Sequence, residues 1–259
     1  VACGTAYHVG VVAKYAFEEL LRIPVEVDVA SEFRYRDPIL NENTLMIIIS
    51  QSGETADTLA ALREAKRAGC RVLSVVNVVG STIATESDDV LYTWAGPEIS
   101  VASTKAYSTQ LAVIYLLALY IGEQLGKFTQ EQLSAYIAAL EKLPEQIDEM
   151  LKHKENIQFF ASKYFNASDM YFIGRNVDYA ASLEASLKLK EISYIHSEAY
   201  AAGELKHGPI SLIEDGTLVI ALATDARLFD KMMSNIKEVK ARGARVLGVA
   251  LEGNRAIYS

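Results

Sequence analysis

The chain has 259 residues, of which 51% are apolar and 22% charged, so it can bury a substantial core and global disorder is excluded. Acidic residues outnumber basic ones by 33 to 25, and the formal net charge of −8 argues against a surface that binds nucleic acid or anionic membranes. The two cysteines, Cys3 and Cys70, form no CxxC pair, which excludes a disulfide framework and a cysteine zinc cluster and favours a reducing compartment.

The chain begins Val1-Ala2-Cys3-Gly4, without an initiator Met or the basic start of a signal peptide. This beginning resembles the end of a strand, so we expect the chain to be an excised piece of a longer protein. Residues 45–49 are apolar at every position, which predicts a strand buried on both faces. A helix follows, with Leu59, Leu62 and Ala65 on one stripe and Gly69 as its C-terminal cap.

Between that strand and that helix lies the strongest chemical signal, Ser50-Gln51-Ser52-Gly53-Glu54-Thr55. A helix N-terminus presents unpaired N–H groups and the positive end of the helix dipole, and three hydroxyls here can converge on one anion. Because the sequence has neither GxxxxGK[ST] nor GxGxxG, a phosphate monoester fits better than a nucleotide. The alternative is an ordinary capped turn, since Ser and Thr are favoured N-caps.

A second polar loop, residues 96–105, precedes an apolar run over residues 111–121. That run is far shorter than the ~20 residues of a membrane span and predicts a buried helix. The Ser and Thr residues of the loop either line a ligand crevice or cap this helix, and Glu98 is equally compatible with a solvated loop charge. Further on, Thr129-Gln130-Glu131-Gln132 has the form of a capping box that opens a helix.

In the predicted helix 180–194, Glu184, Lys188 and Glu191 lie on one face. Such a stripe is usually a solvated, salt-bridged surface. The alternative is a site that handles protons, in which the lysine orients a substrate and a glutamate moves protons. Next, His207 lies in a turn before Gly208-Pro209, where it is either an acid–base group or an unremarkable loop histidine. The other histidines form no metal-binding spacing, so no metal site is predicted.

Two parts of the chain repeat each other. Residues 2–33 and 172–205 both read as a strand end, a Gly turn, a long helix and an extended stretch ending at Glu32 or Glu204, and the strands that follow correspond at a nearly constant offset. Each half alternates strands with helices, which predicts parallel sheets flanked by helices. We expect one domain over residues 1–126, a helical connector over 127–165, and a second domain over 166–259 that is C-terminally incomplete.

Three segments together closely resemble the isomerase half of the glutamine–fructose-6-phosphate aminotransferase family: SQSGETADT at 50–58, PEISVASTKAYSTQ at 97–110 and LKLKEISYIHSEAYAAGELKHGPI at 187–210. The resemblance covers nearly the whole chain. It implies an α/β fold of two tandem flavodoxin-like sugar-isomerase (SIS) domains, and an activity that makes glucosamine 6-phosphate from fructose 6-phosphate without a metal or cofactor. It also implies a cytoplasmic homodimer and an ammonia-supplying glutaminase domain in the same polypeptide.

The resemblance also implies roles for individual residues. The phosphate-binding loop would be Ser50, Gln51, Ser52 and Thr55, and the sugar would contact Thr5, Val101 and Ser103. Glu191 matches the base that moves a proton between C1 and C2, and Lys188 matches its neighbour in the active site. His207 matches the ring-opening histidine, which in this family reaches into the site of the adjacent subunit.

Three departures from the family pattern bear on activity. Ala6 stands where the family usually has Ser, which removes one hydroxyl from the sugar site. The glutaminase domain and the C-terminal tail are absent from this chain, and the tail supplies the family's Schiff-base lysine. We therefore expect the chain as given to bind a hexose 6-phosphate but not to complete amination. In the second half, residues 223–227 replace the phosphate loop, and because Asp225 would repel phosphate we expect one site per chain.

Two other functions stay open. One is a stand-alone SIS deaminase or isomerase acting on another amino-sugar phosphate, and the other is a non-catalytic module that senses sugar phosphates. The joint presence of Glu191, Lys188 and His207 favours catalysis, because a sensor needs only the phosphate loop.

Overall fold

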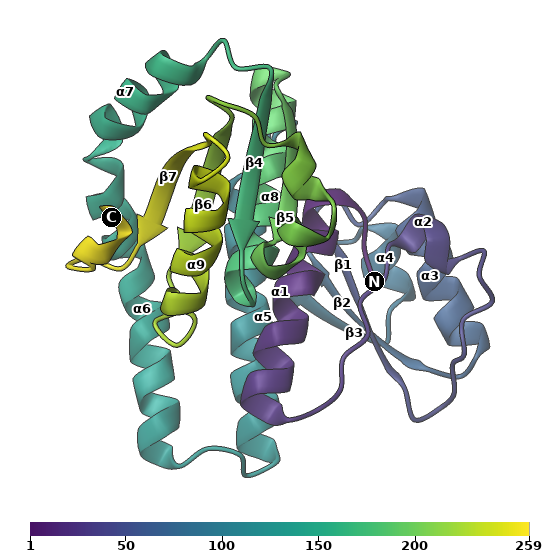
Figure 1. Cartoon of the computed structure of the whole chain (residues 1–259). Coiled ribbons are helices and arrows are strands. Elements are labelled where there is room, and N and C mark those ends of the chain that lie inside the picture. The colour runs from purple at the N-terminus through teal and green to yellow at the C-terminus, as the bar shows by residue number, and fades with distance from the viewer. Residues whose placement is uncertain (259) are drawn as a thin grey trace. The chain divides into compact units, whose positions relative to one another are not determined.

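The computed structural model describes residues 1–258. The chain forms two compact units, unit 1 over residues 1–141 and unit 2 from residue 142 onward, and each is described by itself (Figure 1). The division falls inside helix α6 (Gln130–Leu151), within the segment 127–165 that we proposed as a connector.

Unit 1 is built on a parallel three-stranded sheet with the order β1-β2-β3. Its strands are β1 (Leu45–Ser50), β2 (Arg71–Val76) and β3 (Asp89–Tyr92). Its other helices are α1 (Gly4–Leu21), α2 (Ala30–Phe33), α3 (Ala56–Arg67), α4 (Thr82–Glu86) and α5 (Lys105–Gln124).

Helices cover both faces of this sheet, because successive side chains of a strand point to opposite faces. Met46 and Ile48 of β1 pack into one apolar cluster with α2, α3 and α4. Ile49 packs into the other cluster, with α1 and α5. The prediction of a strand buried on both faces is therefore confirmed, except that Leu45 at its start is exposed.

Local signals located several element boundaries correctly. Leu62 and Ala65 of α3 are fully buried, and Gly69 follows the helix with a φ of +80°, as a C-terminal glycine does. The capping box of α6 is present: Thr129 N donates to Gln132 Oε1 (2.9 Å), and Gln132 N donates to Thr129 Oγ1 (3.2 Å).

Unit 2 contains a parallel four-stranded sheet with the order β5-β4-β6-β7. Its strands are β4 (Asp169–Gly174), β5 (His196–Ala201), β6 (Leu218–Ala223) and β7 (Arg245–Ala250). Its helices are α7 (Lys154–Tyr164), α8 (Val177–Ser193) and α9 (Phe229–Lys240), with the 3-10 turns η1 (Ala202–His207), η2 (Pro209–Leu212) and η3 (Arg255–Tyr258). The main apolar cluster joins β4 and β6 to α9 and η1.

Two sequence expectations about elements were wrong, and a third, the buried helix, was confirmed only in part. Glu32 lies in the short helix α2 and Glu204 lies in the turn η1, so neither ends an extended stretch. The apolar run 111–121 is not buried all round, since Leu116 and Tyr120 are exposed while Ile114 and Ala118 are fully buried. Its apolar residues exceed what one helix face can bury, and sequence periodicity alone did not reveal which of them face the sheet.

Candidate active site

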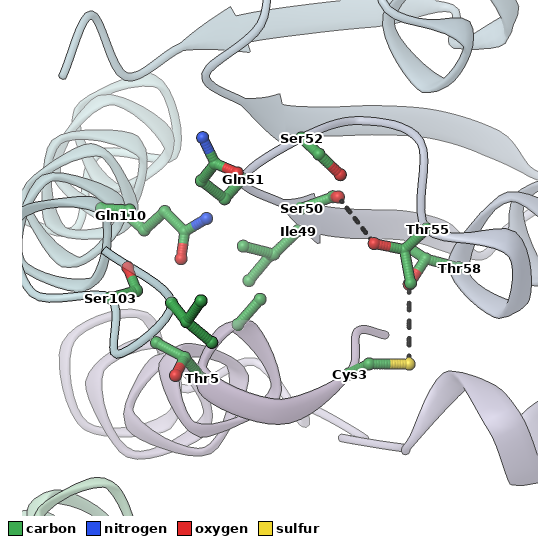
Figure 2. A pocket seen from close by; sticks show the side chains of 13 residues that line it. Cys3, Thr5, Ile49, Ser50, Gln51, Ser52, Thr55, Thr58, Ser103 and Gln110 are labelled. Atoms are coloured by element: carbon green, nitrogen blue, oxygen red, sulfur yellow. Dashed lines mark hydrogen bonds between the residues drawn. The ribbon is translucent and has the colours of Figure 1, made fainter. Parts of the chain in front are cut away.

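The loop that follows β1 is held in one conformation by its own hydroxyls. Gly53 N donates to Ser50 Oγ (3.0 Å), and Glu54 N donates to Ser52 Oγ (3.2 Å). Ser50 Oγ lies 3.4 Å from Thr55 Oγ1, a contact drawn in Figure 2. Gly53 has a φ of +67°, and a Cβ there would lie only 2.0 Å from Ser81 Oγ. Only glycine can therefore take this position without a shift of its surroundings.

Thr55 is the N-cap residue of α3, yet its hydroxyl makes no capping hydrogen bond. Capping explains the preference for Ser and Thr at such positions only when the side-chain oxygen accepts an N–H of the first turn. The ordinary capped turn therefore does not account for Thr55. Thr55 lines the cavity described below.

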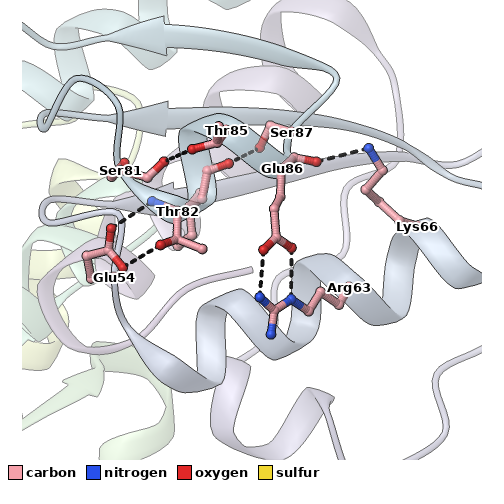
Figure 3. A network of polar contacts seen from close by, with 9 residues as sticks. Glu54, Arg63, Lys66, Ser81, Thr82, Thr85, Glu86 and Ser87 are labelled. Atoms are coloured by element: carbon pink, nitrogen blue, oxygen red, sulfur yellow. Dashed lines mark hydrogen bonds and ion pairs between the residues drawn. The ribbon is translucent and has the colours of Figure 1, made fainter.

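A second set of contacts fastens this loop to α4 (Figure 3). The Glu54 carboxylate accepts hydrogen bonds from Thr82 N (2.7 Å) and Thr82 Oγ1 (2.8 Å), and these bonds lower the pKa of Glu54. Gly53 O accepts from Ile83 N (2.9 Å). The Arg63 guanidinium donates two hydrogen bonds to the Glu86 carboxylate, of 2.8 and 2.6 Å, and these bonds join α3 to α4. The loop is thus held both by hydrogen bonds among its own residues and by hydrogen bonds to α4.

The loop forms one wall of a cavity of about 230 Å³ (Figure 2). All seven substrate-binding residues proposed from the sequence line it: Thr5, Ser50, Gln51, Ser52, Thr55, Val101 and Ser103. Six further residues, which sequence reasoning did not assign to the site or expected only as a lost contact, complete the lining: Cys3, Ala6, Ile49, Thr58, Ala106 and Gln110. At ~30 Å³ per water molecule, the cavity suits a small polar ligand rather than a large one.

The first turns of three helices meet at this cavity. Thr5 lies in the first turn of α1, Thr58 in that of α3 and Ala106 in that of α5. Each helix N-terminus carries a partial positive charge and unpaired N–H groups. Among the described residues that line the cavity, none has a charged side chain, so an anion here would be bound by dipoles and hydroxyls.

Glu98 organises the second loop and is not a solvated loop charge. One carboxylate oxygen accepts hydrogen bonds from Ser103 Oγ and Ala106 N, both at 3.2 Å, and so caps α5. Partial burial opposes ionisation of Glu98, but these bonds outweigh it and its pKa lies below the usual value. Ser103 is thereby held at the cavity, whereas Val101 lines it with 96% of its surface exposed.

On α8 of unit 2, the Lys188 ammonium lies between two carboxylates. Lys188 Nζ is 2.5 Å from Glu191 Oε2 and 3.5 Å from Glu184 Oε1. The side chains of Glu184 and Lys188 are only 6% and 17% exposed, and that of Glu191 is 30% exposed. A fully solvated surface stripe is therefore excluded for Glu184 and Lys188, and sequence reasoning had not included Glu184 among the site residues.

His207 is the last residue of η1 and is exposed. It is followed by Gly208, with a φ of +144°, and by Pro209 at the start of η2. The predicted turn is therefore present, although it consists of two 3-10 turns. The imidazole is accessible to a partner or ligand at the surface.

In the internal repeat, the loop after β6 in unit 2 corresponds to the phosphate loop of unit 1. The hydrogen-bond donors of this second loop are already bonded to a carboxylate of the protein itself. Asp178, on the first turn of α8, accepts from Thr224 N (2.8 Å), Thr224 Oγ1 (2.5 Å) and Asp225 N (3.4 Å). Asp225 itself is paired with Arg227 by bonds of 3.0 and 2.8 Å, and these bonds lower the pKa of Asp225. Asp178, rather than the charge of Asp225, is thus the main obstacle to phosphate here.

Metal-binding clusters and membrane-spanning helices are both absent from residues 1–258. No group of three or more His, Cys, Asp or Glu side chains is arranged to hold a metal ion in this part of the chain. Within the same residues, every helix is too short or too polar to span a membrane.

Comparison with known proteins gives the family. A model of the SIS domain matches residues 1–120 and 163–259, which is more than half of the chain. The chain belongs to the SIS domain family. As the three sequence motifs predicted, it matches the isomerase half of glutamine–fructose-6-phosphate aminotransferase. The C-terminal domain of glucosamine-fructose-6-phosphate aminotransferase from Francisella tularensis has a TM-score of 0.94 to this SIS protein at 40% identity, over 96% of this chain and 71% of that one.

Full-length relatives agree with this match. The isomerizing glutamine–fructose-6-phosphate aminotransferase of Clostridium acetobutylicum is 61% identical over 99% of this chain, and that of Caldanaerobacter subterraneus is 63% identical over 98%. The chain spans 42% of the length of each of these relatives. A glucosamine-6-phosphate deaminase from Thermotoga maritima has the same fold, with a TM-score of 0.80 and 29% identity over 97% of this chain and 75% of that one.

Proposed function

We propose that this chain is the sugar-phosphate isomerase part of an enzyme that converts fructose 6-phosphate to glucosamine 6-phosphate. The observation that carries the proposal is the cavity of unit 1, where all seven residues proposed from the sequence line one space. The aminotransferase relatives and the small size of the cavity support a hexose 6-phosphate as the ligand. In the complete protein, a glutaminase domain of the same polypeptide would supply the ammonia.

In this proposal the two units have different tasks. Ser50, Gln51, Ser52 and Thr55, with the N-terminus of α3, bind the phosphate, and Thr5, Val101 and Ser103 contact the sugar. We propose SIS domains at residues 1–126 and 166–259, joined by the connector 127–165, with one phosphate site per chain. The protein would work in the cytoplasm as a homodimer.

Unit 2 would supply the proton chemistry. Glu191 takes a proton from one of the carbons C1 and C2 of the open-chain sugar and returns it to the other. The ammonium of Lys188, already paired with Glu191, would stabilise the oxygen that gains negative charge in the intermediate. His207 would give and take the proton that opens the sugar ring.

The partly buried ion-paired cluster on α8 favours catalysis over sensing. A module that only senses a sugar phosphate needs the cavity of unit 1 but has no use for a partly buried ion pair. Burying the charges of Glu184 and Lys188 costs desolvation free energy. Deamination of another amino-sugar phosphate uses similar proton transfers and is the second candidate, supported by the deaminase fold relative.

Thr55→Val tests the phosphate site, because valine keeps the shape and removes only the hydroxyl. Hydrogen bonds to a charged group contribute about 1.5–3 kcal/mol, so titration calorimetry should show fructose 6-phosphate and inorganic phosphate both bound at least about tenfold more weakly. Thr85→Val is the control, since Thr85 Oγ1 donates to Ser81 O within α4 and does not line the cavity.

Unchanged affinity for both ligands in Thr55→Val, and in the double variant Ser50→Ala/Thr55→Ala, would rule this loop out as the anion site. The double variant alone is less informative, because Ser50 Oγ also accepts the N–H of Gly53 and shapes the loop.

A further inference from the structure

Gln110 is a buried polar residue on α5 with an unsatisfied amide nitrogen. It is 1% exposed, and its Nε2 has no hydrogen-bond partner among the described residues. Leaving a buried amide unpaired is unfavourable, and such groups in native proteins normally have a partner. A leucine or methionine would fill the same space without this cost, so the amide calls for an explanation.

Gln110 also lines the cavity of unit 1, and Figure 2 shows its side chain directed into it. Among the residues that the structure describes, four further hydroxyls are buried without a partner, and none of their residues lines the cavity: Ser74, Ser81, Ser186 and Ser197. Among the described buried side chains with an unpartnered polar atom, Gln110 is therefore distinguished by its position at the candidate site.

Its place in the cavity separates it from the hydroxyls of the phosphate loop, whereas Gln51 of that loop is drawn nearer to it in Figure 2. In Figure 2, Gln110 and Ser103 lie on one side, and Ser52, Ser50 and Thr55 lie on the other. A phosphate held by the loop would direct the carbon chain of its sugar away from that loop. A carboxamide is uncharged and carries both a donor and an acceptor, which suits a hydroxyl or carbonyl group better than an anion.

We propose that Gln110 is a sugar-binding residue whose amide forms a hydrogen bond with a hydroxyl or carbonyl oxygen on the carbon chain of the hexose phosphate. By turning about its last bond, the amide presents either its oxygen or its nitrogen to the ligand. Gln110 thereby distinguishes a sugar phosphate from a bare phosphate. The proposal rests on the proposed function, since it takes the ligand to be a hexose 6-phosphate.

The test compares Gln110→Met with wild type and with Ser74→Ala, by titration calorimetry on the 259-residue chain. Methionine preserves the length and apolar stem of the side chain and removes the amide. Ser74→Ala is the matched control, because Ser74 is also fully buried without a partner but lies on β2 outside the cavity lining.

Gln110→Met should bind fructose 6-phosphate about five- to tenfold more weakly, the loss expected for one neutral hydrogen bond, and should bind inorganic phosphate within about twofold of wild type. Ser74→Ala should bind both ligands as wild type does. Equal affinity of Gln110→Met and wild type for fructose 6-phosphate would overturn the role of Gln110 alone. Failure of wild type to bind fructose 6-phosphate while binding phosphate would overturn the proposed function as well.

A second measurement needs no stable variant. In the wild-type chain, the side-chain amide signals of Gln110 in a ¹H–¹⁵N spectrum should shift with fructose 6-phosphate and stay in place with inorganic phosphate. Signals that stay in place with both ligands, or that shift equally with both, would contradict the proposal.

Discussion

The contacts of Lys188 define what the two glutamates of α8 can do. The ammonium lies 2.5 Å from Glu191 and 3.5 Å from Glu184, and Glu191 is the most exposed of the three side chains. Glu191 can therefore meet a substrate while the better buried Glu184 holds the lysine. Of the two glutamates, Glu191 is therefore the better candidate for transferring a proton to and from a substrate.

Glu191→Gln in a full-length enzyme should separate proton transfer from binding. Glutamine keeps the size and hydrogen bonding of glutamate but cannot carry the proton. Affinity for fructose 6-phosphate should stay within a few-fold, and proton exchange at the sugar carbons should fall by ~10²-fold or more, as for other lost acid–base groups. The measurement is deuterium incorporation into the sugar phosphate in heavy water, followed by NMR. Wild-type exchange in the variant would leave Glu191 as a structural partner of Lys188.

Glu98 gives a pH-dependent prediction at the scale of one side chain. Its pKa in the folded chain lies below the ordinary value of 4.5, so ionised Glu98 stabilises the folded state above that value. This contribution is lost as the pH falls through the lower, folded-state pKa. Chemical denaturation should find Glu98→Gln less stable than wild type near neutral pH. The two stability curves should converge only as the pH falls below 4.5.

A gap between wild type and Glu98→Gln that is constant through the acid range would show that the charge of Glu98 does not support the cap of α5. Because Ser103 donates to the same carboxylate oxygen, the variant should also weaken binding of fructose 6-phosphate at neutral pH.

Among the elements, α8 and the loop after β6 are joined by Asp178. This carboxylate is buried and accepts hydrogen bonds from the backbone N–H and the hydroxyl of Thr224. Asp178→Ala leaves these donors without their partner, so the free energy of unfolding should fall by about 1–3 kcal/mol in chemical denaturation. Asp230→Ala, at an exposed position on α9, is the control and should change stability by less than about 0.5 kcal/mol. Equal, small losses in both variants would show that water replaces the Asp178 carboxylate without cost.

Sequence reasoning located elements and motifs that depend on nearby residues. The strand at residues 45–49, the glycine after α3 and the capping box at Thr129 follow from rules that act over a few positions, and all three are present. The loop from Ser50 to Thr55 was likewise recognised because its hydroxyls, its glycine and the helix behind it are adjacent in the sequence.

Contacts between distant segments were not predictable in the same way. Asp178 meets Thr224 across 46 positions and Glu54 meets Thr82 across 28, and no periodicity links such pairs. The sequence placed Gln110 at the end of a motif but did not assign it to the site. For a glutamine within an apolar helix, the sequence does not indicate whether the side chain points into a cavity or toward solvent. Its burial and its missing partner became visible only in the fold.

At the scale of the whole molecule, each unit has a parallel sheet and a strand–loop–helix order. The two units differ in the loop that corresponds to the phosphate loop. In unit 1 the loop after β1 opens on a cavity, and in unit 2 Asp178 takes the donors of the loop after β6. The difference supports the proposal that one copy binds the phosphate and the other supplies Lys188 and Glu191.

The last prediction concerns His207, which, if the resemblance to the aminotransferase family holds at this position, reaches into the site of the adjacent subunit. It is exposed at the end of η1, as a residue that serves a neighbouring subunit must be before assembly. The chain should therefore form at least a two-fold dimer, the commonest oligomer, and sedimentation at micromolar concentration should find it.

Mixed subunits of a full-length enzyme test the sharing directly. Glu191→Gln and His207→Ala should each be nearly inactive alone. If His207 acts across the subunit boundary, a hybrid dimer has one site with both defects and one intact site. Half of the dimers formed by random pairing are hybrids. Refolding the two variants together should therefore restore roughly a quarter of wild-type activity. If His207 acts within its own chain, every site in the hybrid keeps one defect and the mixture stays inactive. An inactive mixture, with hybrids shown to form by differently tagged subunits, would place His207 in the site of its own chain.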